Sequence, residues 1–340
     1  MNLSVIILCK DEETTIGAAL EHIARQTLLD RPGLNADIVV VANGCTDQTA
    51  ARARAFEPVL ADRPHITLHV FDLPVGGKSR SWNRAVHEFA DQNADMLLFL
   101  DSDIELQGDD VFARLADRLT GDSGAVACTG YPMKAVARKA EPGLIDRFSL
   151  LMSRQTRHAG ALNGSLYLIR GQVARAIWLP DDTPGEDGFL NAMVTTNGFS
   201  GPLEAGRVQQ VEEVSHYFHA HSPREFIGHE RRMFVGTIIN RWMFEHLWSL
   251  KLSEPAGAKI DQWNRENPHW VEEIIERNSR GRSWLIPHEM VFGRFRSPRV
   301  IGWLRFIVRL PVAVAATLLT IPPAIMANKI LKQKGAASHW

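Results

Sequence analysis

An apolar run that ends in two carboxylates constrains this chain more than any other stretch. Met96 to Leu100 are five consecutive apolar residues, and a run without polar alternation is typical of a strand covered on both faces. Asp101, Ser102 and Asp103 follow at once. Side chains at positions i and i+2 of an extended segment point the same way. Asp101 and Asp103 can therefore face one ion or one polar ligand.

The two carboxylates favour a hard metal ion, although a simpler explanation exists. Open α/β sheets bind ligands at the carboxyl ends of their strands. Two oxygen donors with no Cys or His beside them suit Mg²⁺ or Mn²⁺ better than zinc. A plain exit from a strand into a turn explains the same residues, because Asp and Ser are common in turns. The motif alone leaves both interpretations open.

Length, charge and cysteine content limit the class of protein. A chain of 340 residues suits one large α/β domain with appendages. The formal net charge of −1 argues against nucleic acid as the main partner. Cys9, Cys45 and Cys128 lack metal-ligand spacing and are typical of buried or strand-end thiols in a reduced compartment. Because the N-terminus enters a strand immediately, we expect no signal peptide.

Strands and helices alternate along most of the chain, which predicts the α/β class with a mostly parallel sheet. Apolar, β-rich runs and helical periodicity mark the individual elements. The predicted strands are 3–9, 37–42, 66–71, 96–100, 125–129, 163–170 and 208–218, and the predicted helices are about 14–26, 79–91, 109–120, 186–196 and the stretch from Pro223.

Two loops between these elements carry candidate binding residues. Asp or Glu at a helix start often only caps the helix or compensates its dipole, which can explain Asp11 and Glu13 and leaves Glu12 as a possible ligand. Lys78 begins a predicted helix, where a cation is unfavourable for the dipole. An anionic partner such as a diphosphate would explain Lys78, and a solvated surface lysine is the equal alternative.

A third loop carries two adjacent acids. Pro184 and Gly185 force a turn directly before Glu186 and Asp187. Capping explains one acid, and two acids in a Gly-flanked turn form a candidate general base. Further along, histidines and arginines cluster. Isolated histidines are more often hydrogen-bonded structural residues than ligands, and the arginines form either a solvated face or a phosphate clamp. These residues are His216, His219, His221, Arg224, His229, Arg231 and Arg232.

The C-terminal part is basic and apolar. Residues 292–309 alternate basic with apolar side chains, and Leu310 to Ala327 contain no charge, close to the minimum length of a membrane span. Pro311, Pro322 and Pro323 would kink such a helix. The segment is either a short or tilted anchor or an amphipathic segment lying in the membrane interface, and a buried helix pair is the alternative. Its basic flanks suit anionic headgroups without deciding orientation.

Taken in order, these motifs resemble those of family-2 glycosyltransferases with the GT-A fold, from Leu3 to about Arg232. Lys10–Glu13 is similar to the family's Asn-Glu-Glu turn, which implies that Glu12 contacts the nucleotide. Asn43–Asp47 is similar to the Asp-Gly-Ser-Thr-Asp turn, with Asn43 in place of the base-reading Asp. Lys78 and Asn83 resemble the Gly-Lys-x-x-Ala-x-Asn segment.

The later motifs extend the resemblance to the reaction. It implies that Asp103 binds the metal and that Asp101 and Ser102 contact the ribose or a metal-bound water. It also implies that Asp187, beside Glu186, is the catalytic base. Where processive members carry Gln-x-x-Arg-Trp, residues 229–233 read His-Glu-Arg-Arg-Met. Arg232 is retained and the Trp is missing, which implies a single-addition transferase.

The resemblance implies a domain plan and a function. We expect one GT-A domain with a nucleotide-sugar half at 1–130 and an acceptor half at 131–245. A helical extension at 246–291 and a membrane-associating segment at 292–340 would follow. The expected activity is an inverting, Mg²⁺- or Mn²⁺-dependent transfer from a nucleotide-diphosphate sugar to a hydroxyl acceptor, lipid-linked or part of a cell-envelope glycan. The expected place is the cytoplasmic face of the inner membrane.

Three other functions compete with this expectation. One is a non-catalytic, membrane-associated protein that binds sugar nucleotides, and the second is a nucleotidyltransferase of similar sheet topology. The third is a Rossmann-type oxidoreductase. It is disfavoured because Lys10–Glu13, and not a Gly-x-Gly-x-x-Gly turn, follows the first strand.

Overall fold

The computed structural model describes residues 1–135, 143, 160–218, 223–293, 295, 303–333 and 335–336. It divides into two compact units, which are described in turn. The first comprises Met1–Asp181, Phe189–Ala220 and Leu252–Gln262, and the second comprises Asp182–Gly188, His221–Lys251 and Trp263–Trp340. Of the residues singled out in the sequence, His219, His221, Arg294, Arg296, Arg299 and Lys334 lie outside the described ones.

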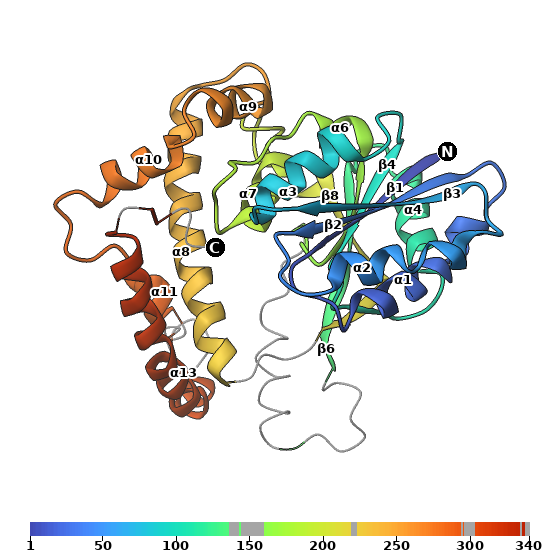
Figure 1. The fold of residues 1–340 in the computed structure, drawn as a ribbon. Coiled ribbons are helices and arrows are strands. Elements are labelled where there is room, and N and C mark those ends of the chain that lie inside the picture. The colour runs from blue at the N-terminus through green and yellow to red at the C-terminus, as the bar shows by residue number, and fades with distance from the viewer. Residues whose placement is uncertain are drawn as a thin grey trace. The chain divides into compact units, whose positions relative to one another are not determined.

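An eight-stranded sheet in the order β3-β2-β1-β4-β7-β6-β8-β5 forms the centre of the first unit (Figure 1). Its strands are β1 Asn2–Cys9, β2 Asn35–Asn43, β3 Ile66–Leu73, β4 Met96–Leu100, β5 Glu105–Leu106, β6 Ala127–Lys134, β7 Leu166–Arg170 and β8 Val208–Phe218. The pairs β2–β3, β1–β2, β1–β4 and β6–β8 are parallel, and the pairs β4–β7, β6–β7 and β5–β8 are antiparallel. The predicted α/β class is confirmed.

Helices cover both faces of the sheet. They are α1 Ile16–Ala24, α2 Thr49–Arg54, α3 Lys78–Arg84, α4 Val111–Gly121, α6 Gly171–Arg175, α7 Glu186–Thr195 and α9 Gly257–Glu266, and a π-helical turn at Ala85–Phe89 continues α3. On one face, α1 and α4 share a buried cluster with alternate residues of β1, β2 and β4. On the other face, Trp82 of α3 stacks on Phe99, which stacks on Tyr167. Because apolar helices cover both faces, β4 can be apolar at every position.

A very short link crosses the sheet after β4. Only residues 101–104 separate β4 from β5, although β4 stands fourth in the sheet and β5 stands eighth. The partner of β5 is β8, whose register against β6 shifts between Thr129 and Tyr131. The Asp-Ser-Asp motif is therefore the connection between the two halves of the sheet.

The second unit is helical. Its helices are α8 Pro223–Ser249, α10 Trp270–Ser279, α11 His288–Phe292 and α13 Trp303–Ile330. Both α10 and α13 pack against α8, and α11 packs against α13. The helix α13 continues through Pro311, Pro322 and Pro323.

Candidate active site

Acidic side chains join the loops after β1 and β2 at the carboxyl edge of the sheet. The carboxylate of Asp11 accepts hydrogen bonds from the Thr46 amide at 2.6 Å and the Thr46 hydroxyl at 3.1 Å. Glu13 accepts one from the Gln48 amide at 3.0 Å. In return, Asp47 accepts one from the Glu13 amide at 3.0 Å. The expectation that Asp11 and Glu13 cap the helix that follows them is wrong, because no described side chain caps α1 and both carboxylates instead bind amides of the loop after β2.

Glu12 lies between Asp11 and Glu13 in the sequence, and its carboxylate is close enough to the Asp-Ser-Asp motif to be affected by its charges. Its amide donates to the Thr49 hydroxyl at 2.8 Å, and its carboxylate accepts a hydrogen bond from Thr15. Burial raises the pKa of the Glu12 carboxyl, and the negative charges of Asp103 and Asp101 raise it further. The carboxylates of β1 and β4 thus repel one another across the edge of the sheet, as expected where a cation binds between them.

The Asp-Ser-Asp motif presents its two acids and buries the residue between them. Asp101 is half-buried and Asp103 is exposed, while Ser102 is buried. The Asp101 amide donates to the Ser165 carbonyl at 3.0 Å, which fixes the start of the motif against the residue before β7. The predicted roles of Asp101 and Asp103 as ligands, and of Ser102 in nucleotide binding, stay predictions.

Lys78 is the cationic member of this edge. Its Nζ lies 3.6 Å from the Asp101 carboxylate, and both side chains are about one third exposed at 38% and 31%. It is the first residue of α3, directly after Gly77. The start of α3 therefore combines a lysine with the N-terminal N–H groups of a helix, a combination that suits an anion.

Asn43 joins the end of β2 to the start of α3. Its Oδ1 accepts hydrogen bonds from the Gly77 amide and the Ser81 hydroxyl, each at 2.8 Å. The backbones of Gly44 and Gly76 approach so closely that a Cβ on Gly44 would lie 2.6 Å from the Gly76 nitrogen. Because the Gly77 N–H can only donate, the amide oxygen of Asn43 must point toward α3.

A buried amide on α3 holds the segment that leads to the Glu-Asp turn. Asn83 donates to the Leu179 carbonyl at 2.8 Å and to the Asp181 carboxylate at 2.9 Å, and it accepts from the Leu179 amide at 2.8 Å. Arg80 lies 3.9 Å from the same Asp181 carboxylate. The role of Asp181 was not predicted from the sequence, because its partners on α3 are almost 100 residues away.

Glu186 and Asp187 belong to the second unit, where their turn packs on α8. Asn240 Nδ2 donates to the Gly185 carbonyl at 2.7 Å. A Cβ on Gly236 would lie 2.8 Å from the Pro184 carbonyl oxygen, so that only glycine allows this approach. Asp187 is exposed, and so is Arg232 on α8. Sequence reasoning missed Gly236 and Asn240, which have no motif of their own.

One compact group of potential metal ligands exists among the described residues, and it does not coincide with the Asp-Ser-Asp motif. The ligand atoms of Asp11, Cys45 and Asp47 lie within 4.8 Å of one another. Both carboxylates of this group already accept backbone hydrogen bonds from the opposite loop. The group is therefore explained by the hydrogen bonds that join the loops after β1 and β2.

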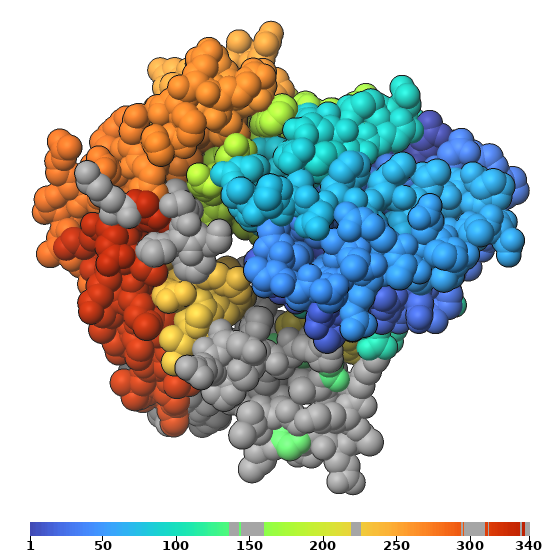
Figure 2. Space-filling model, in the orientation of Figure 1, coloured from blue at the N-terminus to red at the C-terminus, as the bar shows by residue number. Residues whose placement is uncertain are grey.

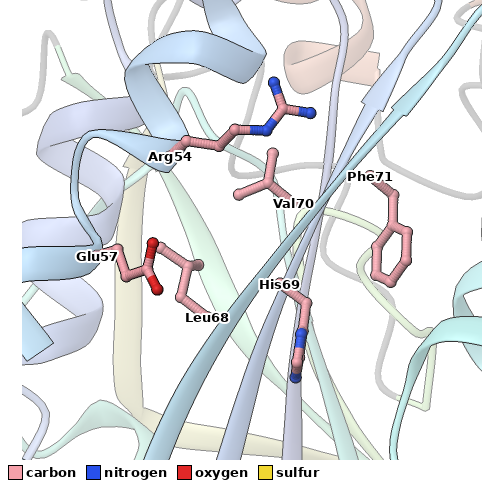
Figure 3. A pocket seen from close by; sticks show the side chains of 6 residues that line it. All are labelled: Arg54, Glu57, Leu68, His69, Val70 and Phe71. Carbon is pink, nitrogen blue, oxygen red and sulfur yellow. The ribbon is translucent and has the colours of Figure 1, made fainter.

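A cavity of about 250 Å³ lies apart from this edge, on the strand β3 (Figure 3). Arg54, Glu57 and residues 68–71 line it. The strand runs from Ile66 to Leu73, so the cavity lies along its middle and not at its carboxyl end. It therefore does not belong to the carboxylate edge formed by β1, β2 and β4.

The comparison with protein families decides the class of the chain. The model of the family "Glycosyl transferase family 2" matches residues 4–182, which include β1 to β4, α3 and the Asp-Ser-Asp motif. The chain belongs to glycosyl transferase family 2. This family-2 protein is accordingly a glycosyltransferase, and the resemblance inferred from its motifs is confirmed.

Among solved structures, one glycosyltransferase shares its GT-A fold with a TM-score above 0.5. A mannosyltransferase, PcManGT from Pyrobaculum calidifontis, in complex with GDP-Man and Mn²⁺, is 16% identical with a TM-score of 0.57. The alignment covers 97% of this chain and 88% of that one. A glucosyl-3-phosphoglycerate synthase from Mycobacterium tuberculosis is 17% identical with a TM-score of 0.47, over 70% of this chain and 79% of that one. No match was found among the curated proteins.

Proposed function

We propose that this glycosyltransferase performs an inverting, metal-dependent, single transfer from a nucleotide-diphosphate sugar to a hydroxyl acceptor. The observation that carries the proposal is the carboxylate edge. Glu12, Asp101 and Asp103 gather there beside Lys78 and the N-terminus of α3. This edge offers hard oxygen donors for a cation and an adjoining cationic place for a diphosphate.

The residues present suit Mg²⁺ or Mn²⁺. Asp103 is the exposed carboxylate of the motif and would hold the ion, with Asp101 next to it. No group of three described ligand side chains within 4.8 Å includes Asp103, so diphosphate oxygens and water would complete the ligand set. A bound ion would neutralise the charge that builds on the diphosphate as it leaves. The mannosyltransferase of the same fold was solved with Mn²⁺ and GDP-Man.

The chain's own residues account for the remaining steps. Lys78 and the first N–H groups of α3 bind the diphosphate, with Arg232 as a second cation, and Glu12, Asn43 and Ser102 position the nucleoside. Asp187, next to Glu186, takes the proton of the acceptor hydroxyl. The hydroxyl oxygen bonds to the anomeric carbon while the bond from that carbon to the diphosphate oxygen breaks, and its electron pair leaves with the diphosphate. Attack opposite the leaving group inverts the configuration.

The acceptor in this proposal is carried by a membrane. The C-terminal segment combines an uncharged stretch with basic flanks, which supports a location at an anionic surface such as the cytoplasmic face of an inner membrane. A lipid-linked sugar or a growing envelope glycan would present its hydroxyl group there. The absence of Trp after Arg232 supports the addition of one sugar per encounter.

The test measures diphosphate release from UDP-glucose and GDP-mannose with and without Mn²⁺, together with calorimetric binding of UDP and GDP. Asp103→Asn and Asp187→Asn should each lower turnover by a hundredfold or more, in line with the ~10²–10⁴ of acid–base groups. Asp103→Asn should also weaken Mn²⁺-dependent binding, whereas Asp187→Asn should retain it. Asp62→Asn, an exposed acid elsewhere, serves as the control. Normal turnover of Asp187→Asn would exclude it as the base.

A further inference from the structure

The helix α13 exposes its large apolar side chains. Leu318 and Leu319 are 61% and 59% exposed, and no polar residue between positions 310 and 326 shares their side of the helix. We call this side the outer face. It consists of Leu310, Val314, Leu318, Leu319, Ile325 and Met326. In the space-filling view, atoms of α13 (red) form part of the molecular surface (Figure 2).

The buried side of α13 carries the small and polar residues. They are Ala313, Ala316, Thr317, Thr320, Ala324, Ala327 and Asn328. The Thr320 hydroxyl donates to the Ala316 carbonyl at 3.0 Å, and Asn328 Oδ1 accepts from the Leu285 amide at 2.8 Å. A helix on a water-soluble surface has the opposite arrangement, with large apolar residues inward. Small residues toward the protein and large ones outward are typical of a helix that faces lipid.

The charged residues near α13 in the sequence indicate which class of lipid headgroup the outer face would meet. Glu289 is the last acidic residue of the sequence, and eight lysines and arginines follow it. They are Arg294, Arg296, Arg299, Arg305, Arg309, Lys329, Lys332 and Lys334. Lys329 and Lys332, at the C-terminal end of α13, are exposed. An apolar face flanked by basic residues is complementary to a bilayer with anionic headgroups.

The partner helix indicates that α13 lies along the membrane surface. An 18-residue window, Ala313–Ile330, has a mean hydropathy of 1.3, which is weak support for a span. Its neighbour α8, which spans Pro223–Ser249, carries Arg241 and Glu245 as an exposed ion pair at 3.1 Å in its C-terminal half. Charged side chains are costly in the hydrocarbon core. Because one side of α13 packs on α8, only the opposite side, the outer face, can contact lipid.

We propose that the outer face of α13 seats the protein on an anionic bilayer, with the helix axis in the plane of the membrane. Its apolar side chains would enter the boundary between headgroups and acyl chains, and the basic residues would bind lipid phosphates. This proposal rests on the membrane location in the proposed function and deepens it by naming the helix face and the class of lipid that attach the protein. A second copy of the chain is the competing occupant, but it would carry the same basic residues beside its outer face, and two copies would bring like charges together.

The experiment measures binding of the full-length protein to vesicles of phosphatidylcholine alone or with 30% phosphatidylglycerol. The double variant Leu318→Gln, Leu319→Gln keeps the charge and should lower binding by roughly a hundredfold, as expected for two leucines that lose apolar burial. Val59→Gln and Leu203→Gln are matched controls, because these side chains are 60% and 71% exposed in the first unit. Both controls should bind like the wild type. Circular dichroism and UDP or GDP binding establish that each variant is folded.

Three further measurements can overturn the proposal. Vesicles without phosphatidylglycerol should bind the wild type more weakly, and equal binding would remove the role of the basic residues. A C-terminal tag should stay open to protease on vesicle-bound protein, and protection of the tag would show that α13 spans. A lipid-free dimer that the double variant dissociates, without vesicle binding by the wild type, would assign the outer face to a second copy. Because the readout is lipid binding, loss of transfer activity alone leaves this proposal intact.

Discussion

The residue His216 is fully buried on β8, where its protonation opposes folding. Its Nε2 lies 2.7 Å from the Ser165 hydroxyl oxygen, and its Nδ1 has no hydrogen-bond partner in the described part of the chain. Burial lowers the pKa of His216 to about 4. The unfolded chain, in which a histidine pKa is near ~6.5, therefore binds this proton more readily than the folded one.

This residue gives the first prediction, a loss of stability in mild acid. As the pH falls from about 6.5 to about 4, the unfolded state gains the proton first, so the free energy of unfolding should fall, by roughly 3 kcal/mol at most for this group. Urea midpoints measured across that range check it. His216→Gln should have a flatter pH profile than the wild type. Burial also lowers the pKa of His87, which remains in the variant, so part of the slope should persist. Identical slopes would contradict the assignment.

The amide of Asn43 gives the second prediction. Asn43→Asp keeps the oxygen that accepts from the Gly77 amide and the Ser81 hydroxyl, so the stability should stay close to that of the wild type. Asn43→Ala leaves both donors without that partner and should cost about 1–3 kcal/mol. Chemical denaturation of the two variants checks this. Equal stability of Asn43→Ala and the wild type would show that the hydrogen bonds contribute little.

Residues that belong to a sequence motif were predicted as site residues. Residues whose role depends on buried hydrogen bonds were not. Glu12, Lys78 and Asp101 were predicted from their places after strands, and the structure brings these three to one edge. Asn240 and His216 were not given their roles, because the meaning of a single amide or imidazole depends on partners at least 50 residues away.

At the scale of elements, the contact between α8 and the Glu-Asp turn gives the third prediction. Gly236→Ala would place a Cβ 2.8 Å from the Pro184 carbonyl oxygen, so the turn must shift. If Asp187 is the base, even a small shift should lower turnover, by about a hundredfold for a displacement near 1 Å. Binding of the nucleotide should change little. Steady-state kinetics and calorimetry separate the two effects.

A matched control lies on the same helix. Gly228 has no atom within 4 Å of a built Cβ, and alanine there should leave turnover unchanged and stabilise the helix by about 0.5–1 kcal/mol. If Gly236→Ala behaved like Gly228→Ala, the packing of the turn on α8 would have no part in the reaction.

Elements with continuous apolar runs were predicted well, and short or irregular ones were not. The predicted strand 208–218 is β8, and the predicted runs 3–9 and 96–100 are β1 and β4 within one residue. The strand predicted to end at 129 continues as β6 to Lys134, because it pairs again with β8 after the change of register. The two-residue strand β5 and the π-helical turn after α3 are too short or too irregular to have a periodic signal.

For the whole molecule, ligand binding should couple to stability, which gives the fourth prediction. A nucleoside diphosphate with Mn²⁺ at about 100 times its dissociation constant should raise the free energy of unfolding by about 2.7 kcal/mol. A thermal-shift panel of UDP, GDP, CDP and ADP, each with and without Mn²⁺, measures this and reports the preferred base. Asp103→Asn should lose the Mn²⁺-dependent part. A shift that is the same with and without Mn²⁺ would argue against the metal.

The C-terminal region shows why the side of α13 that faces the rest of the protein could not be predicted from the sequence. An uncharged stretch at Leu310–Ala327 is equally consistent with an anchor, an interfacial helix and a buried pair. The structure adds the identity of the inward side, which holds Thr317 and Thr320. That assignment depends on where α8 and α11 pack, and no periodicity of α13 alone reports it.

The link at residues 101–104 has a consequence for how this protein can change. Strands four places apart in a flat sheet are about 19 Å from one another at ~4.8 Å per strand. The five residue steps from Leu100 to Glu105 reach at most about 17 Å, and Ser102 and Asp103 form a turn. The sheet must therefore curl until its last strand returns toward β4, and the short link that contains Asp101 and Asp103 joins the two strands. An inserted residue would change the closure of the sheet and the spacing of Asp101 and Asp103 in the proposed cation site together, so neither can change separately.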